Sequence, residues 1–162
     1  MREHDIPATI TRAEATATGT QKARSFGVLS ESNTGGPLTV RLDSLEISSQ
    51  ATTEDGEGRS FGIYSYDNST VSMKGGSVTS SAQSNNGDST AYGIFSGESS
   101  RVTSGAGSVT ASSSSDGSDT WVNSYGIQAD GSSSFTATNP LIKIEASATS
   151  REKASELFAY GI

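Results

Sequence analysis

Cysteine is absent from this chain of 162 residues, and histidine occurs once, as His4. Without cysteine, structural disulfides and cysteine-based metal sites are excluded, and the redox compartment is left open. A Ser-His-Asp triad would need His4, which we interpret as a solvated residue of the terminal segment. No apolar run approaches the length of a membrane span, so we expect no membrane insertion of this segment. The opening residues also lack the apolar core of a signal peptide, so the signal of an exported protein would lie outside this sequence or have been removed.

Positive charge and apolar residues are scarce as well. The 11 Lys and Arg face 18 Asp and Glu, so the net charge is −7. The basic residues are scattered and form no stripe that could track phosphates, so we expect no nucleic-acid partner. Hydrophobic residues make up only 31% of the chain, which favours a poor core or disorder in a compact globule. The strict placement of the apolar residues argues against disorder.

What the sequence does contain is one phrase repeated five times: an aromatic residue, a glycine and a β-branched aliphatic residue. The copies are Phe26-Gly27-Val28, Phe61-Gly62-Ile63, Tyr92-Gly93-Ile94, Tyr125-Gly126-Ile127 and Tyr160-Gly161-Ile162. Successive copies are 31 to 35 residues apart. A period in this range indicates a stacked array, in which each unit buries its apolar face against its neighbours.

Further apolar residues recur at fixed positions after the aromatic residue, which we count as position zero. They fall at positions 2, 10, 12, 17 and 19, and a small residue stands at position 4. Within each cluster the spacing is even, which is the period of a β-strand with one buried face. Each unit therefore predicts three short strands, near positions 0–4, 10–13 and 16–20, and then a polar connection. We expect the odd positions 1 and 3 to point outward.

The repeat predicts an all-β fold, a parallel β-helix or β-solenoid with three strands per coil and about four coils. Like strands of successive coils would stack about 4.8 Å apart. We expect a single domain over residues 1–162. Its parts are a partial N-terminal coil at 1–25, repeats at 26–60, 61–91, 92–124 and 125–159, and the start of a further coil at 160–162.

Acidic, cysteine-free repeats rich in serine, threonine and glycine resemble the right-handed β-helix stalks of bacterial surface proteins, such as autotransporter passenger domains and adhesins. The segments AYGIFS at 91–96 and NSYGIQA at 123–129 are similar to such repeats. The resemblance covers nearly the whole chain. It implies an exported, extracellular or surface-displayed bacterial protein that acts as a scaffold, adhesin or spacer.

The outward positions carry little that would support catalysis. Polysaccharide-active enzymes share the β-helix fold, but they cluster charged residues on adjacent coils. Here positions 11 and 18 hold serine or threonine except at Glu46 and Lys143. No two carboxylates stack as a glycosidase pair would, so we expect no enzyme activity. Ice binding by threonine columns is a further alternative, but Ser72, Glu46 and Lys143 interrupt the columns.

Acidic connections at 54–57, 85–88 and 116–119 fall at similar places in successive coils. Their oxygen atoms would suit calcium, although they do not match the nonapeptide repeat of calcium-binding β-rolls. We interpret them as solvated turns and expect no cofactor, with calcium as the alternative.

A candidate ligand site follows from the residues expected to face outward. Position 3 holds Leu29, Tyr64, Phe95 and Gln128, position 5 adds Tyr66, and position 1 is always glycine. A bare backbone column flanked by aromatic rings would form a shallow groove. Tyr64, Tyr66 and Phe95 could stack there on a sugar or on side chains of a partner. There are two structural alternatives. In the first, the glycine is needed for a bulge or a tight bend. In the second, the longer connections cover the rings with their apolar residues Trp121, Val122, Leu157 and Phe158.

The ends of the predicted coil raise a question of assembly. A parallel β-helix has open edges at its top and bottom, which template further pairing unless they are capped. The last three residues are themselves a copy of the repeated aromatic-glycine-aliphatic phrase, and neither end of the sequence looks capped. Either the chain is a segment of a longer array, or copies associate head-to-tail into a fibre. In the fibre, residues 1–7 would take the place of a missing middle strand.

Overall fold

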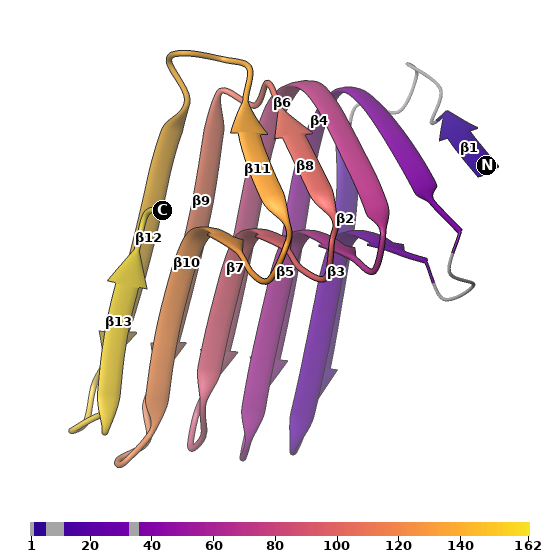
Figure 1. Ribbon diagram of the computed structural model, residues 1–162. Coiled ribbons are helices and arrows are strands. Elements are labelled where there is room, and N and C mark those ends of the chain that lie inside the picture. Colours follow the sequence, from indigo (N-terminus) through magenta and orange to yellow (C-terminus); the bar gives the residue numbers. More distant parts are fainter. Residues whose placement is uncertain (1, 6–11, 33–35) are drawn as a thin grey trace.

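The computed structural model describes residues 2–5, 12–32 and 36–162. All regular elements in these residues are β-strands, and every strand pair is parallel (Figure 1). The strands are β1 (Arg2–Asp5), β2 (Arg12–Gly19), β3 (Lys22–Glu31), β4 (Leu38–Thr53), β5 (Glu57–Tyr66), β6 (Ser69–Ser84), β7 (Ser89–Ser96), β8 (Arg101–Ser104), β9 (Ser108–Ser115), β10 (Trp121–Ala129), β11 (Ser134–Ala137), β12 (Lys143–Ser150) and β13 (Glu156–Tyr160).

The strands stack in three columns. The first column contains β3, β5, β7, β10 and β13, which lie side by side in Figure 1. The second contains β1, β4, β6, β8 and β11, and the third contains β2, β4, β6, β9 and β12, because the long strands β4 and β6 each belong to two columns. The chain winds through the columns in turn, which gives a β-solenoid of about four turns. The predicted fold class is confirmed.

Aliphatic side chains form in-register ladders along the centre of the solenoid. Val71 lies opposite both Val40 and Val102 in the second column. Ile63 lies opposite Ile94 in the first column, and both side chains are fully buried. Burying such a side chain contributes about 1.5–3 kcal/mol. Like residues recur at like positions because each coil must fill the same space above its neighbour.

Serine completes the interior where the aliphatic ladders end. The hydroxyl of Ser49 donates to that of Ser25 at 2.9 Å, and Ser60 donates to Ser49 at 2.9 Å. Ser80 extends the chain by donating to Ser60 at 2.8 Å. Buried polar groups are stable when they are hydrogen-bonded in this way. The ladder of hydroxyls explains how a chain with only 31% hydrophobic residues has a filled interior.

The strands of the first column begin earlier than predicted, three or four residues before the aromatic residue. Trp121 and Val122 therefore belong to β10, and Leu157 and Phe158 belong to β13. The alternative in which these four residues lie in connections and cover the aromatic rings is wrong. Val122 is fully buried, because it continues the inward position of Ser89 in β7.

The N-terminal strand β1 pairs with residues 38–41 of β4, with His4 opposite Val40. It occupies the middle-strand position of the first coil. Of the segment 1–7 expected there, residues 1, 6 and 7 lie outside the described residues. Within the described chain, the outer edges of β1, β2 and β3 at one end, and of β11, β12 and β13 at the other, face no further strand.

Candidate functional site

The repeated glycine faces the interior, although we predicted that it would face outward. A Cβ atom added at Gly62 would lie 2.3 Å from Cγ1 of Val78 and 2.5 Å from the carbonyl oxygen of Gly93. The pairing of β5 with β7 includes Phe61 and Ile63 but skips the glycine between them. Glycine and the following aliphatic residue both point inward, which breaks the strict alternation as a bulge does. The expected groove of bare backbone is therefore absent from this face of the described strands.

Because of this break, the aromatic residue before each glycine lies on the outer face. These five rings, which we call the aromatic ladder, are Phe26, Phe61, Tyr92, Tyr125 and Tyr160. Neighbouring ring centroids are 4.8–5.6 Å apart, and the ring planes differ by only 3–9°. The rings therefore cover one another's faces along the solenoid. Each aromatic contact of this kind contributes about 0.5–1.5 kcal/mol.

A second row of rings stands beside the aromatic ladder. Tyr64 and Phe95 lie 5.1 Å apart, with planes 11° from parallel, and Tyr66 lies 5.8 Å from Tyr64. The plane of Tyr64 is 81° from that of Phe61, so the second row is roughly perpendicular to the ladder. The structure brings the three predicted site residues together on one face. We call these three rings and the aromatic ladder the outer aromatic surface.

Two arginines border this surface, although the sequence predicts only scattered basic residues. Arg24 of β3 lies opposite Arg59 of β5 in the strand register. They line a shallow hollow of about 190 Å³ together with Phe61, Tyr64, Tyr92 and Phe95. The signal for this placement was in the sequence, because both arginines stand two residues before the aromatic residue of the repeat.

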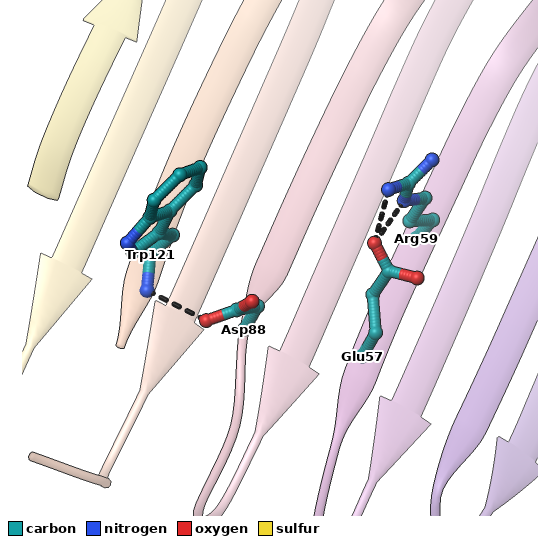
Figure 2. A network of polar contacts seen from close by, with 4 residues as sticks. All are labelled: Glu57, Arg59, Asp88 and Trp121. Carbon is teal, nitrogen blue, oxygen red and sulfur yellow. Dashed lines mark hydrogen bonds and ion pairs between the residues drawn. The ribbon is translucent and has the colours of Figure 1, made fainter. Parts of the chain in front are cut away.

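One carboxylate lies next to the hollow. Arg59 donates to the same oxygen of Glu57 from Nε and from Nη2, and this ion pair is drawn in Figure 2. Further along the same column, a carboxylate oxygen of Asp88 accepts a hydrogen bond of 2.8 Å from the backbone nitrogen of Trp121 (Figure 2). These two carboxylates therefore already have partners within the protein.

No family model matches this chain. Comparison with curated proteins and with solved structures also finds no match. The architecture is therefore the part of the resemblance to bacterial surface proteins that the structure supports.

Burial and the arginines act in opposite directions on the tyrosines of the outer aromatic surface. Burial raises the pKa of Tyr92 above the usual tyrosine range, a neighbouring tyrosine adds to the rise, and Arg59 opposes it. Burial also raises the pKa of Tyr64, followed by the charge of Glu31, while Arg24 lowers it. Both cations are thus electrostatically coupled to phenols beside the hollow.

We expect alkaline pH to destabilise the fold through Tyr92. Below about pH 10 the phenol is protonated in both the folded and the unfolded chain. Above that pH the unfolded chain releases its proton first, since the pKa of Tyr92 is raised in the folded state. The free energy of unfolding therefore falls as pH rises. Urea unfolding at several pH values, with tyrosinate absorbance, measures this loss, and Tyr92→Phe should reduce it. Equal pH dependence in both proteins would contradict the assignment.

Among the described residues, the acidic connections do not come together as a metal site. In the described part of the chain, no three side chains of His, Cys, Asp or Glu are placed to hold a metal ion. The acidic connections pair with other coils: Asn86 donates to Asp55 at 2.7 Å, and Arg151 donates to Asp116 at 3.2 Å. The described residues also contain no helix long and apolar enough to cross a membrane.

Proposed function

We propose that this chain is a non-catalytic structural and adhesive segment of an exported bacterial surface protein. Its coils act as a rigid scaffold or spacer outside the cell. The outer aromatic surface, with Tyr64, Tyr66 and Phe95, is the part that contacts a glycan or a host surface. The proposal is supported by the β-solenoid fold together with the acidic, cysteine-free repeats that resemble bacterial stalks.

The observation that carries the structural role is the continuous register of the three columns. Residues 38–53 of β4 pair with residues 69–84 of β6 along nearly their whole length. Each further strand extends the same ladders, and the aliphatic and serine side chains interlock between coils. Four inter-strand steps of about 4.8 Å give a rod of roughly 19 Å between the first and last strand of a column. Such a rod holds its two ends at a set separation.

Pulsed electron spin resonance on a doubly labelled chain tests this rigidity. Thr18 of β2 and Thr149 of β12 are both exposed and stand four steps apart at equivalent positions of the third column. The chain has no cysteine, so Thr18→Cys combined with Thr149→Cys places labels only there. We expect one narrow distance distribution centred near 19 Å, adjusted for the label arms.

A matched pair of labels checks the scale. Thr18→Cys with Gln83→Cys uses the same column at two steps, so the expected separation is about 10 Å. Unfolding in denaturant should broaden both distributions. A broad distribution for the four-step pair in the folded protein would contradict a rigid spacer.

Head-to-tail association through the coil ends stays a prediction. In column order, a second copy would place its Lys22 beyond Glu156 and its Phe26 beyond Tyr160. These neighbours would pair opposite charges and continue the aromatic ladder. An assembly of this type is open-ended, because each added copy presents the same edge again.

A further inference from the structure

We infer that the hollow between Arg24, Arg59 and the outer aromatic surface binds a sugar ring that carries a carboxylate, such as a uronic acid unit of a polysaccharide. This inference rests on the proposed adhesive function and names the class of its ligand. The hollow measures about 190 Å³. Pockets that enclose whole drug-sized ligands measure about 300–1,000 Å³. A shallow site of the smaller size holds one ring of a longer chain at the surface.

The positive charge of the two arginines beside the hollow favours an anionic ligand. Arg24 and Arg59 lie on adjacent strands at the same register position, and Glu57 pairs with Arg59 alone. Arg24 has no hydrogen bond or ion pair to any described residue. Of the two guanidinium groups, only that of Arg59 has a carboxylate partner among the described residues, in a protein whose net charge is −7. A carboxylate from a ligand would complete the pairing, because its two oxygens match the planar fork of a guanidinium.

The aromatic rings that line the hollow indicate that the anionic group is part of a sugar and is not a free inorganic ion. The rings of Tyr64 and Phe95 line the hollow together with the two arginines. The apolar face of a pyranose ring packs on such rings, whereas phosphate or sulfate would leave them unused. These rings stand on strands and not on loops, so the surface is already in place before the ligand arrives.

The charges also set the direction in which the sugar binds. Glu31 influences Tyr64 from the far end of β3, seven residues after Arg24. Seven residues of a strand span roughly 23 Å. A ligand carboxylate is attracted at the arginine end of the surface and repelled at the glutamate end. The acidic group of the sugar therefore points toward Arg24.

Isothermal titration calorimetry with a short oligogalacturonate and with its methyl ester tests the inference. The ester retains the sugar rings and lacks the negative charges, so we expect it to bind at least about tenfold more weakly. Arg24→Gln should weaken binding of the acid about tenfold and leave binding of the ester unchanged. Arg101→Gln is the matched control, because Arg101 is exposed on β8 in another column and loses the same charge.

The aromatic contribution is tested by Tyr64→Ala and Phe95→Ala, each of which should weaken binding of both ligands. Circular dichroism on each variant shows whether it is folded, and the variant that remains folded decides the result. Equal affinity for acid and ester would overturn the role of the arginines and leave the adhesive surface in place. Equal losses in Arg24→Gln and Arg101→Gln would also overturn it, since general charge attraction would then explain binding. No binding of either ligand would overturn the sugar site, while the label distances test the structural role separately.

Discussion

Gly93→Ala is expected to lower the free energy of unfolding by about 3 kcal/mol. An added Cβ atom would lie 2.4 Å from Cγ1 of Val109 and 2.5 Å from the carbonyl oxygen of Gly126. The carbonyl belongs to the next coil, and it cannot retreat without pulling β10 away from β7. The valine belongs to an aliphatic ladder whose members are packed on both sides. The new methyl group therefore has no direction in which its neighbours can yield freely.

Gly107→Ala provides the control for this experiment. Gly107 is exposed, and the nearest atom to an added Cβ is 3.7 Å away, which is ordinary contact. We expect a change within about 0.5 kcal/mol there. Thermal and urea unfolding followed by circular dichroism measure both variants, and the expected loss for Gly93→Ala corresponds to roughly 6–12 °C in Tm. Equal stability of the two variants would show that the repeated glycine does not face the core.

Ile63→Ala is expected to cost about 2–5 kcal/mol, because it opens a cavity in the middle of an aliphatic ladder. Ile63 is fully buried and lies between Val28 of the preceding coil and Ile94 of the next. Shortening this side chain removes contacts with both neighbours at once. The coils above and below are held apart by their own backbone ladders, so they cannot close the gap.

The control for this cavity is Leu141→Ala, since Leu141 is 85% exposed. Removing its side chain should change the free energy of unfolding by less than about 0.5 kcal/mol. The same unfolding measurements apply to both variants. If both variants lost a similar amount of unfolding free energy, the aliphatic ladders would not be the main support of the solenoid.

Much of the fold was predictable, because a solenoid repeats one environment in every coil. Val40, Val71 and Val102 recur at one position of the repeat and stack in one ladder. The strand starts were less predictable. Val122 and Leu157 stand where the other coils have Ala23, Gly58 and Ser89, so no common residue type marked the beginning of the first strand. Pairing with neighbouring coils extends those strands, and local sequence does not show it.

The candidate site was also predictable in part: its aromatic residues were expected, and its arginine pair was not. Tyr64, Tyr66 and Phe95 were expected on the outer face, and they lie there together. Arg24 and Arg59 were missed as a pair, because Thr90 and Asn123 occupy the equivalent positions of later coils and hide the pattern. Two residues from coils 35 positions apart become neighbours only when the stacking register brings them to one place.

By itself, the sequence determined the period, the parallel stacking and the residues of the aliphatic and aromatic ladders, since these follow from like residues at like positions. Only the tertiary structure decided which way the repeated phrase faces. Counting by twos assumes an unbroken pleat, and the pleat breaks at glycine because the neighbouring backbone and the opposing Val or Ile leave no room for a side chain there. That break turns each aromatic ring outward and places the rings beside the arginines.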